Sequence, residues 1–135
     1  MPRMDRRLDS LDISFRPHAI ELLARAVEAG LAVVIVQTRR TPEEHAANLA
    51  SGRSRIKHSK HLDGLAIDIA PLAIYDLHGP DKIQWDASDP AWQKLGAIGE
   101  ALGLTWGGRF RDEKGEPWFD GGHFEMPTHH QGGQP

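Results

Sequence analysis

Two short segments of the chain contain residue types that bind a catalytic metal ion. His61 and Asp68 lie seven residues apart in the first segment, and His123 lies in the second. Two neutral imidazoles and one carboxylate bind Zn²⁺ while leaving the complex cationic and one coordination position free for water, as hydrolytic zinc enzymes require. Because the chain has no cysteine, thiolate ligands and disulfides are excluded. The three residues therefore predict a catalytic site with one Zn²⁺ per chain.

The spacing of the first two predicted ligands requires a turn between them. In one helix His61 and Asp68 would be about 10 Å apart along the axis, and in one strand their odd separation would place them on opposite faces. Gly64 permits a turn after His61, before the chain enters a predicted strand that carries Asp68. His58 is an alternative ligand if its segment is helical.

A hydrolytic metal site also needs a group that accepts a proton from water and delivers one to the leaving amine. Asp120 is the first candidate, because Gly121 and Gly122 permit a tight bend that would bring its carboxylate toward the water. Glu125 is the competing candidate, since it shares a strand face with His123. It could instead support that ligand from the second shell.

Three helices are predicted to position these groups. They cover residues 17–29, residues 41–52 and residues 89–103, and the second opens with a capping box, Thr41-Pro42-Glu43-Glu44. In the first helix, four apolar residues recur at helical spacing and predict its apolar face: Ile20, Leu23, Ala24 and Val27.

Short apolar runs predict the strands, and the short strands late in the chain are expected to pair in antiparallel fashion. The predicted strands cover residues 31–37, 65–70, 104–106, 118–119 and 123–125. Residues 53–60 are expected to form an exposed loop, 71–89 a long excursion beside the cleft, and 128–135 a disordered polar tail. Helices mixed with short strands predict one α+β domain over residues 1–127, a small and mostly antiparallel sheet with flanking helices.

The charge and the apolar content of the chain limit the classes of partner that this domain is expected to bind. The formal net charge of -3 over 135 residues gives no basic surface of the kind that nucleic-acid binding proteins show, so nucleic acid is not expected as a partner. Neither a secretory signal nor an apolar stretch long enough to anchor the chain in a membrane is visible. We expect a monomer that is made in the cytoplasm.

The chain resembles a family of zinc peptidases in three motifs: Arg40-Thr41-x-x-Glu44, Ser59-x-His61-x-x-Gly64-x-Ala66-x-Asp68 and Asp120-x-x-His123-Phe124. This family includes D-alanyl-D-alanine carboxypeptidases, D,D-dipeptidases and phage L-alanyl-D-glutamate endopeptidases, with the fold that hedgehog signalling domains share. The resemblance covers roughly residues 8–126. It implies that His61, Asp68 and His123 bind zinc and that Asp120 is the catalytic base.

The same resemblance implies contacts with the substrate. Arg40 would face the substrate and stabilise its carboxylate or the developing oxyanion. Ser59 would orient His61 or contact the substrate, and capping a local turn is an equal alternative for it. The segment Gln37-Thr38-Arg39 departs from the usual family pattern, which affects specificity more than catalysis.

The motif Asp120-Gly-Gly-His123-Phe124 follows the pattern of the phage endopeptidases. It implies an endolysin that hydrolyses the L-alanyl-D-glutamate bond of the peptidoglycan stem peptide and reaches the wall when another protein opens the membrane. Two alternatives stay open. One is a D,D-carboxypeptidase or D,D-dipeptidase acting on D-Ala-D-Ala ends, and the other is a non-catalytic metal-binding module.

Overall fold

The computed structural model describes residues 4–54, 58–73 and 83–128. Its helices are α1 (Arg16–Glu28), α2 (Pro42–Ser51) and α3 (Pro90–Ala101), and its strands are β1 (Val33–Gln37), β2 (Ala66–Pro71), β3 (Thr105–Trp106) and β4 (His123–Glu125). Three short 3-10 helices complete the described elements: η1 (Leu8–Ser10), η2 (Lys60–Asp63) and η3 (Gly107–Arg109).

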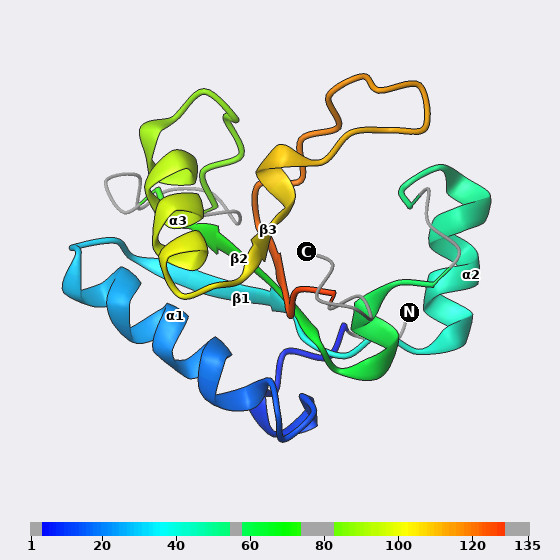
Figure 1. Ribbon diagram of the computed structural model, residues 1–135, viewed down its shortest axis with the longest axis horizontal. Coiled ribbons are helices and arrows are strands. Elements are labelled where there is room, and N and C mark those ends of the chain that lie inside the picture. Colours follow the sequence, from blue (N-terminus) through cyan, green and yellow to red (C-terminus); the bar gives the residue numbers. More distant parts are fainter. Residues whose placement is uncertain (1–3, 55–57, 74–82, 129–135) are drawn as a thin grey trace, which may run out of the picture.

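The predicted α+β class with a small antiparallel sheet is confirmed (Figure 1). The predicted tail lies almost wholly outside the described residues, as does the middle of the predicted 71–89 excursion.

The four strands form one antiparallel sheet in the order β1-β2-β4-β3. Its register places Asp68 of β2 opposite His123 of β4 on one side and opposite Gln37 of β1 on the other. Strand β1 contains an irregularity between Ile35 and Gln37, where the pairing shifts by one residue. Since residues opposite one another in a sheet project to the same face, the register gathers three polar side chains in one row.

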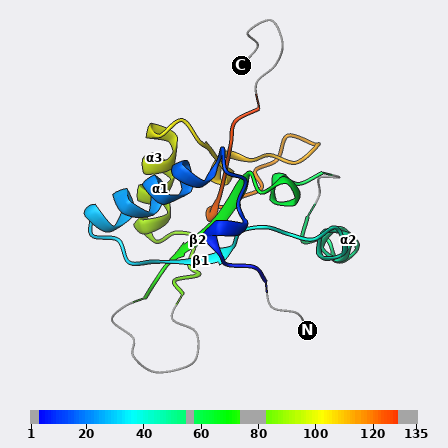
Figure 2. The same ribbon diagram turned by 90° about the horizontal axis from the view of Figure 1, so that it is seen from below.

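The opposite face of the sheet carries the apolar core. Ile67 and Phe124, which are paired across β2 and β4, are fully buried, whereas their neighbours Asp68 and His123 alternate to the polar face. Helices α1 and α3 lie together on one side of the sheet, and α2 lies apart from them (Figures 1 and 2). One face of the sheet therefore packs in the apolar core, and the other carries the candidate site residues.

Helix α1 confirms the predicted segment but only part of its predicted apolar face. Ile20 and Val27 are 49% and 66% exposed, whereas Leu23 is half-buried and packs against the core. The fully buried residues of the helix are Ala19, Leu22 and Ala26. Both sets have helical spacing, so periodicity alone could not separate them.

The strand predicted at residues 118–119 is wrong. Trp118 donates its backbone N–H to the carbonyl of Phe110 at 2.8 Å, but no strand forms there. The ring of Phe119 instead contacts Trp92 and Trp106 edge to face, with centroids 6.4 and 6.1 Å away. The aromatic character that favoured a strand reflects this side-chain packing.

Two glycines let α3 approach the sheet closely. A Cβ atom on Gly99 would lie 2.3 Å from the Phe124 ring, and one on Gly96 would lie 2.4 Å from the Trp106 ring. We expect the clash in Gly99→Ala to outweigh the roughly 1 kcal/mol gained in helix propensity, so that the free energy of unfolding falls by about 1–3 kcal/mol. Urea denaturation measures this change. Lys94→Ala, at an exposed position of the same helix, is the control, and equal stability of both variants would contradict the packing argument.

Candidate metal centre

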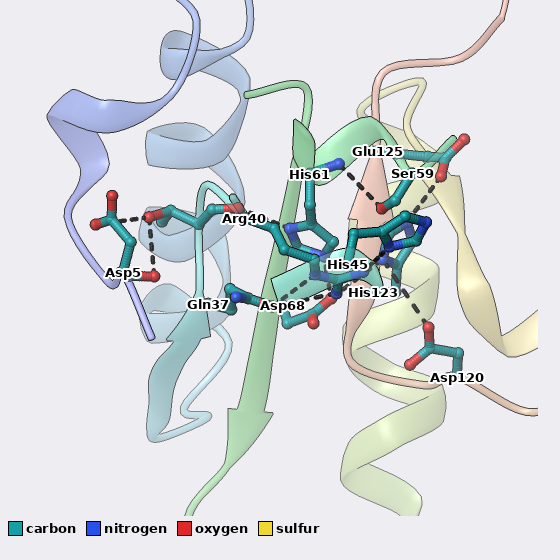
Figure 3. A network of polar contacts seen from close by, with 11 residues as sticks. Asp5, Gln37, Arg40, His45, Ser59, His61, Asp68, Asp120, His123 and Glu125 are labelled. Carbon is teal, nitrogen blue, oxygen red and sulfur yellow. Dashed lines mark hydrogen bonds and ion pairs between the residues drawn. The ribbon is translucent and has the colours of Figure 1, made fainter. Parts of the chain in front are cut away.

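The three predicted ligands meet at one point on the polar face of the sheet. Asp68 Oδ1 lies 3.0 Å from His61 Nε2 and 3.1 Å from His123 Nδ1 (Figure 3). One potential ligand atom from each residue lies within 4.8 Å of the others. Residues from η2, β2 and β4, far apart in the sequence, thus converge as a set of two imidazoles and one carboxylate.

The turn that brings His61 to Asp68 is built from the residues around η2. Ser59 caps this 3-10 helix, and its Oγ accepts the backbone N–H of His61 at 3.2 Å. Gly64 ends the helix with φ 71°, in the left-handed region, and a Cβ atom there would lie 2.7 Å from the backbone nitrogen of Asp12. The turn predicted at Gly64 is therefore present, and Ser59 has the capping role that the sequence left as one alternative.

Hydrogen bonds at the back of each imidazole fix which nitrogen faces the centre. His61 Nδ1 lies 2.7 Å from the carbonyl oxygen of Thr38, which only accepts, so Nδ1 donates and Nε2 is the nitrogen that faces Asp68. His123 Nε2 lies 2.7 Å from Glu125 Oε1 and donates to it, which leaves Nδ1 facing the centre. Such partners behind a histidine ligand orient the ring and fix its tautomer.

Glu125 is held in this supporting position. Its side chain is 14% exposed, and Oε2 forms an ion pair with Lys60 Nζ at 3.6 Å. The carboxylate is thus engaged from two sides, behind His123 rather than in front of it. This geometry favours the supporting role of Glu125 over the role of base.

The donor set fits a tetrahedral zinc ion. Ligand bonds of about 2.0–2.2 Å at tetrahedral angles place neighbouring donor atoms about 3.3 Å apart. The separations of 3.0 and 3.1 Å around Asp68 Oδ1 are within a few tenths of an ångström of that value. The alternative ligand His58 is not part of the cluster: its side chain is 65% exposed and its Nε2 contacts Asp63 at 2.8 Å.

The charges around His123 couple metal binding to pH. Burial lowers the pKa of His123, but hydrogen bonds with Asp68 and Glu125 outweigh this effect and raise the pKa to about 10. In the metal-free protein this imidazole is therefore protonated near neutral pH. A metal ion must displace that proton to bind Nδ1.

We expect the affinity for Zn²⁺ to rise about tenfold per pH unit between roughly pH 6 and 8, because a higher pH removes the competing proton. Isothermal titration calorimetry in buffers of different ionisation enthalpy measures both the affinity and the proton release. An affinity that does not change over this range would contradict the proposed competition.

Asp120 lies at the edge of the cluster. Its Oδ2 is 3.9 Å from His123 Nδ1, and 46% of its side-chain surface is exposed. The predicted bend is present: the backbone N–H of His123 donates to the carbonyl of Asp120 at 3.1 Å, and the N–H of Asp120 donates to Gly107 at 3.0 Å. Burial of the carboxyl, together with the negative charge of Asp68, raises the pKa of Asp120. The group is placed to exchange protons beside the metal ligands.

Arg40 also reaches the polar face, supported by two residues that sequence reasoning missed. Gln37 Oε1 accepts from Nε and Nη2 of Arg40 at 3.2 and 3.1 Å (Figure 3). Nη1 donates to Nδ1 of the buried His45 at 3.2 Å. The signal for His45 was its place in the helix directly after Arg40, but a single histidine on a helix carries little information alone.

A hollow with basic and hydroxyl groups opens beside the cluster, and we call it the basic hollow. It is lined by Arg40, Arg53, Ser54, Ser59, His61, Phe110, Trp118, Asp120 and His123. The structure thus brings together all six residues that the sequence predicted for the site, namely Arg40, Ser59, His61, Asp68, Asp120 and His123. Their chemical roles remain predictions.

Comparison with known proteins shows the family. Residues 52–126 match the family described as D-alanyl-D-alanine carboxypeptidase. The L-alanyl-D-glutamate peptidase of Escherichia phage T5 is 32% identical over 126 residues, which cover 82% of this chain and 88% of the phage protein. The L-alanyl-D-glutamate peptidase of Listeria phage A118 is 36% identical over 92 residues, which cover 67% of this chain and 30% of that protein.

A solved structure supports the fold. The crystal structure of the L-Ala D-Glu endopeptidase ChiX of Serratia marcescens matches with a TM-score of 0.62 at 16% sequence identity, over 89% of this chain and 83% of that one. Together these findings show a small α+β peptidase, and the chain belongs to the D-alanyl-D-alanine carboxypeptidase family. Members of this family are generally metal-dependent, in agreement with the cluster of two histidines and an aspartate. In the described part of the chain, no helix has the length and apolar character to cross a membrane.

Proposed function

We propose that this protein hydrolyses the L-alanyl-D-glutamate bond in the stem peptide of bacterial peptidoglycan, with Zn²⁺ held by His61, Asp68 and His123. The observation that carries the proposal is the position of Asp68 Oδ1 between His61 Nε2 and His123 Nδ1, at 3.0 and 3.1 Å. Two relatives named L-alanyl-D-glutamate peptidases support the choice of bond. Both come from phages, which supports a role in lysis of a bacterial host.

The residues around the metal have separate tasks in this mechanism. His61, Asp68 and His123 would hold Zn²⁺, which would supply Lewis-acid chemistry toward the scissile carbonyl and toward a water molecule. Asp120 accepts the proton of the attacking water at its carboxylate and passes it to the departing amide nitrogen. Its raised pKa makes the carboxylate a stronger acceptor for the proton of water, and the protonated carboxyl is still acidic enough to give that proton to the departing nitrogen.

Arg40 binds the substrate in this proposal. Gln37 and His45 both accept from its guanidinium, and neither carries a negative charge when it does so. The positive charge of Arg40 is therefore not neutralised by these supports and acts on a substrate carboxylate or on the developing oxyanion. Glu125 keeps His123 in the orientation that binds the metal.

Mass spectrometry of fragments released from purified peptidoglycan tests the proposal. We expect new termini at the L-alanyl-D-glutamate bond, loss of cleavage on chelation and recovery on addition of Zn²⁺. Release of free D-alanine would instead support a D,D-carboxypeptidase, the function named by the family description. Metal binding without any cleavage would support a non-catalytic module.

A further inference from the structure

A second hollow borders the metal centre and has a different character from the basic hollow. It has a volume of about 310 Å³, and three aromatic side chains, Trp85, Trp92 and Phe119, contribute to its lining. Asp68 and Asp120 line it as well, so it opens directly beside the proposed ligand and base. We call it the aromatic hollow.

The aromatic wall of this hollow is held in place by its surroundings. The Phe119 ring contacts Trp92 and Trp106 edge to face and packs over Gly121, where an added Cβ atom would lie 2.4 Å from the ring. Trp106 Nε1 donates to the carbonyl of Gly121 at 2.8 Å and so fixes the same bend. Phe119 is nevertheless 41% exposed, and Trp85 is 58% exposed. Fixed aromatic surface beside catalytic carboxylates is a feature of a binding site, because ligand pockets combine apolar walls with a few polar groups.

The two hollows border the same cluster and differ in charge. The basic hollow contains Arg40 and Arg53. Among the residues that the structure describes, the only charged side chains in the lining of the aromatic hollow are Asp68 and Asp120, and Asp120 lines both hollows. A substrate bond at the metal centre is therefore flanked by a cationic surface on one side and by a surface of aromatic and apolar side chains without cations on the other.

The proposed scissile bond has the same asymmetry. Its amine side is D-glutamate, which carries carboxylates, and its acyl side is L-alanine, whose side chain is a methyl group. We propose that the aromatic hollow binds the L-alanyl side of the scissile bond together with the uncharged acyl group joined to the alanine nitrogen, an inference that rests on the proposed function. The carboxylates of the D-glutamyl side then face Arg40 and Arg53 of the basic hollow, which fixes the direction of the peptide across the metal centre.

The size of the hollow indicates that more than alanine enters it. About 310 Å³ is at the lower end of ligand pockets, which span roughly 300–1,000 Å³, and a methyl group fills little of it. In peptidoglycan the alanine nitrogen is acylated by the lactyl group of the glycan, which is uncharged and can bury its apolar atoms against Phe119 and Trp85. A substrate with a free alanine amine lacks this acyl group, so it leaves the apolar surface of Phe119 and Trp85 uncovered.

The test compares two substrates that differ only at the alanine nitrogen, L-alanyl-D-glutamate peptides with a free amine and with an N-acetylmuramyl group. The zinc-loaded wild-type protein is expected to show a higher kcat/KM for the muramyl substrate. In Phe119→Ala and Trp85→Ala the ratio of the two kcat/KM values is expected to fall by about tenfold or more, mainly through KM, as expected for a lost apolar contact. Phe119→Tyr, which keeps the ring, should restore the ratio.

Val27→Ala is the matched control, since it removes an exposed apolar side chain from α1, away from both hollows. It should leave both kcat/KM values unchanged. A wild-type ratio in both Phe119→Ala and Trp85→Ala would overturn the subsite while leaving the proposed function in place. Failure of the wild-type protein to cleave either substrate would overturn the proposed function, and the subsite with it.

Discussion

Asp120→Asn is expected to lower kcat for peptide cleavage by about 10²–10⁴-fold, the usual contribution of a positioned general acid or base. Asparagine has nearly the same shape but accepts no proton at its amide. The carboxylate of Asp120 is 3.9 Å from His123 Nδ1, and its two backbone hydrogen bonds to His123 and Gly107 are unaffected by the change. The fold and the metal ligands should therefore remain intact.

Zinc content and activity must be measured together in this experiment. We expect the wild-type and Asp120→Asn proteins each to bind about one Zn²⁺ per chain, because Asp120 is not among the three proposed ligands. Asp63→Asn, at an exposed carboxylate beside the site, is the control and should keep full activity. Wild-type activity in Asp120→Asn would exclude it as the base, and a complete loss in Glu125→Gln with normal zinc content would then assign that role to Glu125.

The second large effect is expected from the pair His61→Ala and His58→Ala. These histidines are three residues apart, but His61 is 1% exposed at the cluster while His58 points to Asp63 at the surface. Removing His61 leaves one imidazole and one carboxylate, too few protein ligands for a catalytic zinc site. We expect zinc content and activity to fall to background in His61→Ala and to stay at wild-type values in His58→Ala.

A thermal shift measurement separates loss of metal from loss of fold. Zn²⁺ at 100 times its dissociation constant should stabilise the wild-type protein by about 2.7 kcal/mol, and it should not stabilise His61→Ala. Asp68→Asn, which preserves the side-chain volume, provides a second ligand variant if His61→Ala unfolds. Full zinc binding by both ligand variants would contradict the assigned metal centre.

The proposed ligands could be predicted because their signals are local. Gly64 between His61 and Asp68 indicates a turn, and the bend before His123 is visible in two consecutive glycines. The structure places all three side chains together. Chemistry limited the choice further, since the chain has no cysteine that could replace them.

The parts that could not be predicted depend on contacts between distant segments. The contacts of Arg40 with Gln37 and His45 depend on the register of β1 and on the position of α2. The buried face of α1 carries Ala19 and Ala26, while the more apolar Ile20 and Val27 are exposed, and helical spacing alone does not distinguish these pairs. At Phe119, an aromatic residue that favours strands packs on two tryptophans in a loop. In each case tertiary packing outweighed a local preference.

The pairing shift in β1 decides which side chain of that strand is opposite Asp68. In an unbroken ladder of the same sequence Val36, not Gln37, would hold this position, because Ile35 pairs with Ile69. Loss of the irregularity would therefore present hydrocarbon where the guanidinium of Arg40 now finds an amide oxygen, with all three proposed metal ligands unchanged.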